Sequence, residues 1–283
     1  MASTATNLDS EHPHASRTSL RHQLRILHVI AGAEFKLKYT GSALGYVWSI
    51  LKPLLLFGML YAVFGHVFKL GATSPYYPLS LLTGIVLFYF FQDATTLGMN
   101  SLVARQSLLR KLAFPRLIIP TAATLTAAIT FCANLTIIAA LVAWKGIVPR
   151  ADWLLLLPLM LELYAFILGV SLILATLFVR LRDLGQLWEL AVQLFFYATP
   201  ILYPVGFLPS WGRRLVFISP FTQVLQDIRS LVIYPDSPAN TITAAQALAG
   251  YGGHAIPVTV AVLFLVGGLL FLKRQAPWFA ERV

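Results

Sequence analysis

Six long apolar stretches constrain this chain more than any other feature of its sequence. An α-helix rises 1.5 Å per residue, so about 20 apolar residues cross the hydrocarbon core of a membrane. Unpaired backbone groups are costly in lipid, which makes helices the expected spanning form. We therefore predict an all-α membrane protein with six transmembrane helices per subunit, in residues 45–68, 78–100, 117–144, 153–179, 187–205 and 256–272.

The composition agrees with lipid as the solvent. Of the 283 residues, 58% are hydrophobic and 11% are charged, whereas a soluble domain carries roughly a quarter charged residues. The strict alternation that a membrane β-barrel needs is missing. Two of the six stretches are less regular than the others, because Pro200 and Pro204 interrupt the fifth and the sixth is short.

Positively charged residues in short loops predict the orientation of the helices. Fourteen Lys and Arg fall on the side that contains both termini and the loop between the second and third stretches, against six on the other side. We therefore expect both termini in the cytoplasm of a multi-pass protein. The net charge of +10 fits anionic lipid headgroups better than nucleic acid.

Two segments differ from both simple loops and simple spans. Residues 20–40 place apolar side chains on one helical face and basic side chains on another, which is typical of a helix lying in the membrane interface. The alternative is a soluble helix that packs on another part of the protein. Residues 206–255 are half apolar and rich in proline, which favours an external pair of re-entrant gate helices. Residues 1–19 read as a disordered cytoplasmic tail, which leaves 41–283 as the transmembrane domain.

The chain lacks the motifs of an enzyme. No lysine precedes Ser or Thr, so the chain has no P-loop for ATP, and neither HExxH nor GxSxG occurs. The histidines form no metal-ligand cluster, and Cys132 is the only cysteine. We therefore expect no catalytic residue, no metal and no cofactor bound by this chain.

Four charged residues fall inside the apolar stretches: Lys52, Asp93, Glu162 and Glu189. Intramembrane charges are costly and often mark a functional site. Proton-coupled transport would use such carboxylates, but we favour polar groups that line a pore or pack helices. Lys52 lies close enough to one end of its stretch to extend its ammonium to the headgroups.

Three segments of the sequence resemble one known family. They are EFKLKYTGSALGYVWSILKPLLLFGMLYAVFGHVFK (34–69), FYFFQDATTLGMNSLVARQSLLRKLAFPRLIIP (88–120) and LFVRLRDLGQLWELAVQLFFYATPILYP (177–204). Together they resemble the membrane subunit of ABC exporters for lipid-linked polysaccharides, the O-antigen, capsule, teichoic-acid and galactan type. The resemblance covers about residues 34–235. One departure is Ser219-Pro220, where the family usually has Asn-Pro.

The resemblance implies that a separate ATPase subunit moves this chain. In the family, the loop between the second and third spans is a coupling helix, here within 103–116. Its basic residues would pair with acidic groups of the ATPase, and an aromatic anchor would fill an apolar socket. The alternative is that these basic residues only set the topology. The expected coupling residues are Arg105, Leu109, Arg110, Lys111, Phe114, Pro115, Arg116, Arg182 and Asp183.

The family also implies a homodimer, two copies of the ATPase with its ATP and Mg, and a location in the bacterial cytoplasmic (inner) membrane. An ABC exporter of a small lipid or drug is the alternative function. For the headgroup of a lipid-pyrophosphate we expect Arg21, Arg25, Lys36 and Lys38. For the channel wall we expect Phe88, Tyr89, Phe91, Asp93, Phe195, Phe196 and Tyr197, unless these rings pack helices or face lipid. For the external gate we expect Trp211, Arg213, Arg214, Pro220 and Phe221.

Overall fold

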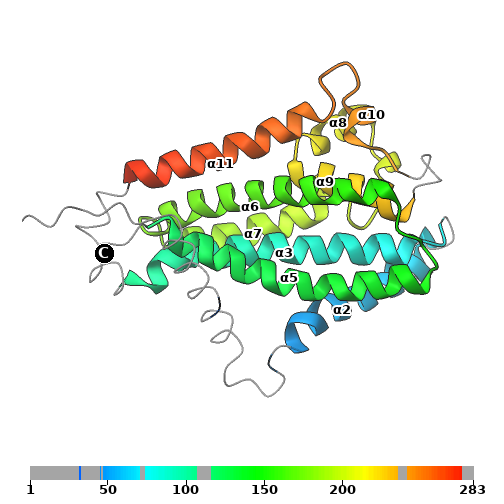
Figure 1. Cartoon of the computed structure of the whole chain (residues 1–283), viewed down its shortest axis with the longest axis horizontal. Coiled ribbons are helices and arrows are strands. Elements are labelled where there is room, and N and C mark those ends of the chain that lie inside the picture. Colours follow the sequence, from blue (N-terminus) through cyan, green and yellow to red (C-terminus); the bar gives the residue numbers. More distant parts are fainter. Residues whose placement is uncertain are drawn as a thin grey trace, which may run out of the picture.

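Long helices that run side by side dominate the structure, a computed structural model (Figure 1). It describes residues 32, 45, 47–70, 74–106, 116–234 and 241–275. Within these residues all regular structure is helical. Five helices are long and apolar enough to cross a membrane: Val47–Val67, Tyr77–Ala104, Ile118–Trp144, Ala151–Phe178 and Ala255–Gln275.

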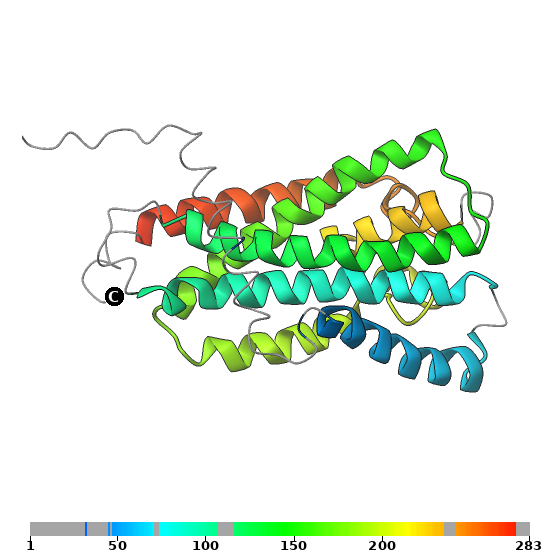
Figure 2. The ribbon, with the colours of Figure 1, turned by 60° about the horizontal axis from the view of Figure 1, so that its bottom comes forward.

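These spans correspond to labelled elements. Helix α2 (Val47–Leu60) continues as a π-helical stretch, η1 (Tyr61–Val67), and a short 3-10 turn, η3 (Ala151–Leu155), leads into α6 (Leu156–Phe178). The other three spans are α3 (Tyr77–Ala104), α5 (Ile118–Trp144) and α11 (Ala255–Gln275). Helix α3 is the most buried of the five and contacts α2, α5, α6 and α7, whereas α11 packs mainly on α6 (Figures 1 and 2).

The fifth predicted stretch differs from a simple span. Helix α7 covers Leu184–Ala198, so its 15 residues reach about 22 Å, short of the roughly 30 Å hydrocarbon core. The helix ends because Thr199 precedes Pro200 and takes an extended conformation, with φ −80° and ψ 138°. The helix therefore ends just before Pro200, one of the two prolines expected to interrupt the stretch 187–205. That α7 and the segment after it cross the membrane as a sixth span stays a prediction.

Short helices fill the segment after α7. They are η4 (Val205–Phe207), α8 (Ser210–Phe217), α9 (Pro220–Ile228), the π-helical η5 (Arg229–Ile233) and α10 (Ala244–Ala247). They gather at the end of the bundle where α11 begins (Figure 1). Every residue of α9 is buried, so this part of the predicted gate segment is core rather than free loop.

Helix α9 is tied to the start of α11 by a polar contact. Asp227, which is 6% exposed, lies 3.0 Å from the Nε2 atom of His254 through its Oδ2 atom. Gln223 donates a hydrogen bond of 2.7 Å to the same oxygen, and Glu162 of α6 interacts electrostatically with Asp227. Burial raises the pKa of Asp227 above its usual value, although Gln223 and His254 oppose that change.

Glycines allow α6 and α11 to touch through their backbones. A Cβ atom on Gly169 would lie 2.4 Å from the carbonyl carbon of Phe264, and one on Gly268 would lie 2.6 Å from the carbonyl oxygen of Gly169. Small residues permit this close approach between membrane helices. The neighbouring Gly267 has no atom within 4 Å of its added Cβ.

This contact yields a matched pair of variants. Gly268→Ala forces the two backbones apart and is expected to cost about 1–3 kcal/mol, the usual range for overpacking. Gly267→Ala adds the same methyl group one residue away in open space and should leave the protein unchanged or slightly stabilised. Thermal unfolding of the detergent-purified chain measures both, and equal melting temperatures for the two variants would contradict the close contact.

The pKa of Asp227 predicts a pH effect. Because that pKa is raised in the folded state, the folded protein holds the proton more tightly than the unfolded chain does. The contribution of this group to the free energy of unfolding therefore falls as the pH rises from the ordinary value of 3.8 through the raised pKa. Asp227→Asn removes the titration, so the melting temperature of wild type minus that of the variant should decrease with rising pH. Parallel curves would contradict this assignment.

Candidate functional site

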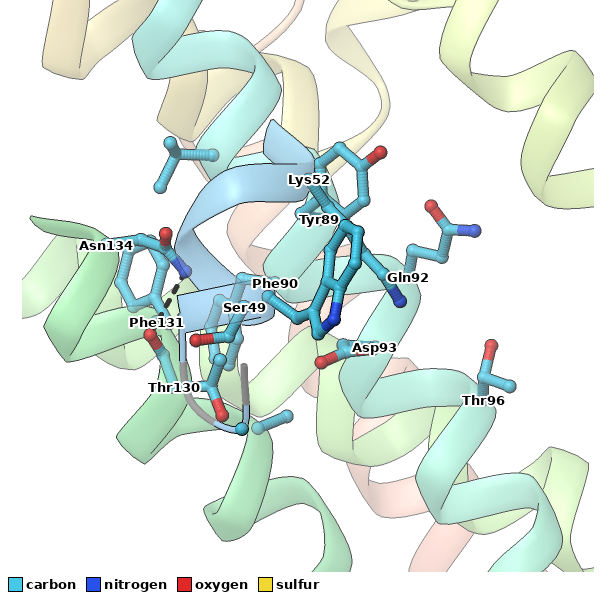
Figure 3. A pocket seen from close by; sticks show the side chains of 14 residues that line it. Ser49, Lys52, Tyr89, Phe90, Gln92, Asp93, Thr96, Thr130, Phe131 and Asn134 are labelled. Atoms are coloured by element: carbon cyan, nitrogen blue, oxygen red, sulfur yellow. Dashed lines mark hydrogen bonds between the residues drawn. The ribbon is translucent and has the colours of Figure 1, made fainter. Parts of the chain in front are cut away.

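A polar cavity of about 540 Å³ opens between α2, α3 and α5. Figure 3 shows the side chains from these helices that surround it. Its polar lining consists of Ser49, Lys52, Gln92, Asp93, Thr96, Thr130 and Asn134, and its aromatic lining of Trp48, Tyr89, Phe90 and Phe131. Its volume lies in the range of small-molecule binding sites, 300–1,000 Å³.

Helical spacing explains how these residues meet. Residues three, four and seven apart share one face of a helix, and α3 places Tyr89, Gln92, Asp93 and Thr96 on the cavity side at that spacing. Helix α2 contributes Ser49 and Lys52, which are three residues apart, and α5 contributes Thr130 and Asn134, which are four apart. Tyr89, Asp93 and Lys52 were singled out in the sequence, whereas the other polar residues of the lining were not.

The cavity offers both hydrogen-bonding groups and aromatic surfaces. The amide of Asn134 donates to the carbonyl oxygen of Thr130 at 3.1 Å, and its own Oδ1 atom is buried without a hydrogen-bond partner. Phe90 and Phe131 stack with ring centroids 4.5 Å apart. Lys52 and Asp93 bring opposite charges to the same wall. The cavity therefore suits a ligand with many hydroxyl groups and an apolar face.

The predicted channel residues divide into two groups. Tyr89 and Asp93 line the cavity, and Tyr197 is 58% exposed. The remaining four are packed inside the chain: Phe88, Phe91 and Phe196 are buried and Phe195 is half-buried. Within a single subunit these four rings pack helices, the alternative raised from the sequence.

Three of these rings contact Phe221, one of the predicted gate residues. Phe221 is fully buried, and its ring centroid lies 5.9 Å from Phe88, 5.7 Å from Phe91 and 5.6 Å from Phe195. Phe88 is eleven residues after the start of α3, about 17 Å along the helix. The chain therefore extends deep into the bundle at the start of α9.

The end of the same short-helix segment returns to the start of α3. Arg229, eight residues after Phe221, donates a hydrogen bond of 3.0 Å to the carbonyl oxygen of Ser80, three residues into α3. The segment from Phe221 to Arg229 therefore runs antiparallel to α3 and back to the end of the bundle from which it entered. This is the path that a re-entrant helix follows.

The other predicted gate residues lie nearer the surface. Trp211 is 70% exposed, Arg213 is half-buried, and Pro220 is buried at the first turn of α9. Arg214 donates a hydrogen bond of 3.3 Å to the hydroxyl of Tyr251 and lies 5.0 Å from its ring centroid.

The predicted coupling residues are described only in part. Arg105 follows α3, Arg116 precedes α5, and Arg182 and Asp183 lie between α6 and α7. The end of α3, the start of α5 and the connection from α6 to α7, where these four residues occur in the sequence, lie at the end of the bundle opposite α8 and α10 (Figure 1). The others lie outside the described residues: Leu109, Arg110, Lys111, Phe114 and Pro115, together with the predicted headgroup residues Arg21, Arg25, Lys36 and Lys38.

The described part of the chain holds no cluster of three His, Cys, Asp or Glu residues that could bind a metal ion. Of the four charged residues noted in the apolar stretches, Lys52 and Asp93 both line the cavity. Glu189 is exposed on α7.

Comparison with known proteins agrees with this architecture. Two relatives, both O-antigen export system permease proteins RfbA, are from Klebsiella pneumoniae and Myxococcus xanthus. The first is 30% identical over 214 residues, 75% of this chain and 82% of the relative, and the second is 28% identical over 186 residues, 66% and 71%. Residues 26–233 match the ABC-2 type transporter family. With that match over most of its length, the chain belongs to the ABC-2 type transporter family of membrane proteins.

Proposed function

We propose that this chain is the channel-forming subunit of an ATP-driven exporter that moves a lipid-linked polysaccharide from the cytoplasm across the bacterial inner membrane. The observation that carries the proposal is the similarity to O-antigen export permeases over most of their length. A cavity that combines hydroxyl, amide and charged groups with aromatic surfaces supports a sugar cargo. A strongly apolar site would fit a drug or small lipid better.

The exporter would contain two copies of this chain and two copies of an ATPase that binds ATP and Mg. Membership of the ABC-2 family supports the ATPase partner. The gathering of Arg105, Arg116, Arg182 and Arg180 at one end of the bundle supports a cytoplasmic face there (Figure 1). On that topology the segment of α8 to α10 faces the exterior and serves as the gate.

Force from the ATPase would enter through residues 103–116. Closure of the ATPase subunits would push this loop. The push would move α3, which ends at the loop, and α5, which begins after it, as rigid bodies. The lipid-pyrophosphate would bind the basic residues of segment 20–40 before the glycan enters the channel. Tyr89 and Asp93 would contact the glycan, and the packed rings around Phe221 would hold the gate closed.

The coupling assignment predicts the effect of a charge reversal. The double variant Arg110→Glu and Lys111→Glu should abolish export, because acidic groups on the ATPase would then repel the loop, while the protein still inserts in the membrane. The measurement is the amount of glycan at the cell surface and of lipid-linked glycan retained in the cytoplasm. The matching reversal Lys145→Glu, at the opposite end of α5, should leave export unchanged. Export by the double variant at the wild-type level would contradict the assignment.

The cavity predicts a second set of export variants. Trp48→Ala and Tyr89→Ala remove aromatic surface from the cavity lining, and each should lower export several-fold, because the apolar face of a sugar ring would lose a surface on which to stack. Trp144→Ala removes a ring that is 79% exposed and distant from the lining, so it serves as the control. Membrane abundance of each variant separates lost transport from lost folding. Normal export by both cavity variants would exclude the cavity from the path of the glycan.

A further inference from the structure

A second, smaller cavity lies at the end of the bundle where α8 and α10 gather, the proposed external end. Its volume is about 240 Å³, and it lies between the start of α3, the irregular segment 201–207 and η5. The polar residues that line it include Tyr77, Ser80, Gln226, Arg229, Tyr234 and Thr241. Neither the coupling mechanism nor the cavity between α2, α3 and α5 involves this space.

The central residue of this cavity is a buried arginine. Arg229 is 5% exposed and donates hydrogen bonds to three carbonyl oxygens: Pro200 at 2.7 Å, Ser80 at 3.0 Å and Ile201 at 3.0 Å. Burial lowers the pKa of Arg229 to about 10, which still leaves it protonated at neutral pH. No carboxylate in the described part of the chain pairs with it.

Three polar groups of the lining remain unused. They are the Nε atom of Arg229, the Nε2 atom of Gln226 and the hydroxyl of Thr241, each buried and each without a hydrogen-bond partner. The residues that carry them are at most 5% exposed. A buried donor without an acceptor costs roughly 1–3 kcal/mol, and more when it is charged. Two donors and a cation around one cavity therefore form a site that favours an acceptor with negative charge.

A purely structural role explains only part of this arrangement. The three carbonyl bonds hold residues 200–201 against α3, and Gly84 leaves space for the guanidinium, since a Cβ atom there would lie 3.0 Å from Nη2. Those bonds explain the position of Arg229. They leave its Nε atom, the amide of Gln226 and the cavity itself without a role.

We propose that this cavity binds an oxyanion, a phosphate or a carboxylate, held by Arg229, Gln226 and Thr241. The volume falls below the usual range for small-molecule sites, so the cavity accepts one anionic group rather than a length of sugar chain. Under the proposed function two sources supply that chemistry at this end: an acidic substituent of the exported glycan and the phosphate of a lipid headgroup. The binding itself does not rest on the proposed function.

Thermal unfolding of the full chain in detergent tests the proposal, with inorganic phosphate as the probe and chloride at equal ionic strength as the reference. Wild type should show a saturable rise in melting temperature with phosphate, because a ligand that binds only the folded state stabilises it. Gln226→Leu removes one donor without touching the carbonyl bonds of Arg229, and should weaken phosphate binding about tenfold or more. Lys145→Gln, an exposed cation at the same end of the bundle, should keep the wild-type response.

A variant that carries a carboxylate at the cavity gives an independent check of anion binding. Gln226→Glu places a carboxylate in the cavity, so it should raise the melting temperature in phosphate-free buffer and abolish the response to phosphate. A buried carboxylate without a cation to pair with would instead destabilise the chain. Arg229→Gln removes three carbonyl bonds as well as the charge, and is less informative because it is expected to unfold more readily.

Two results would overturn the proposal: no saturable shift for wild type, or the same shift for wild type and Gln226→Leu. A shift with glucuronate, but not glucose, assigns the site to an acidic sugar, and one with glycerol phosphate to a lipid headgroup. Both support an oxyanion site, and failure of all of them leaves the export function untouched because no transport is measured.

Discussion

The fold depends on how the chain satisfies its backbone where a helix stops inside the bundle. Hydrocarbon offers no hydrogen-bond partners, so a break in a helix is tolerated only where side chains or protein take over the exposed carbonyls. After α7 this happens residue by residue. The hydroxyl of Tyr203 donates to the carbonyl of Ala198 at 3.0 Å, Arg229 donates to those of Pro200 and Ile201, and the hydroxyl of Tyr77 donates to that of Leu202 at 3.0 Å. These bonds allow the chain to turn back at this point and position α9 inside the bundle.

Helix α3 separates two environments with different uses. One face packs Phe88 and Phe91 against the rings of α7 and α9, which makes a largely aromatic contact. The adjoining face carries Tyr89 and Asp93 into the large polar cavity. A movement of α3 would therefore change this aromatic contact and the cavity together. Under the proposed function, one movement caused by the ATPase would act on both the gate and the glycan site.

Hydropathy predicted the five long spans because burial in lipid acts on each apolar run separately. Pro200 marked the end of α7 in the sequence, but the path of the chain after it could not be predicted, since that depends on Tyr77 and Arg229, which are distant in the sequence. Phe88, Tyr89 and Phe91 of α3 were all expected at a channel wall, with helix packing or lipid contact as the alternative. Because neighbouring residues of a helix point in different directions, Phe88 and Phe91 are buried inside the chain whereas Tyr89 lines the cavity. Arg229 was counted only as a loop charge, because nothing local to it shows that three remote carbonyls surround it.

The glycine contact between α6 and α11 has a mechanical consequence. The backbones of the two helices touch at Gly169 and Gly268, and side chains such as Phe166 and Phe264 pack between them on either side of that contact. We therefore expect α6 and α11 to move as one rigid unit. At one end of the pair Arg180, after α6, donates to Gln275 of α11, and at the other end Asp227 of α9 contacts His254, which precedes α11. Under the proposed function, bending would then concentrate in α2 and α7, which pack on α3 less extensively than α5 and α6 do.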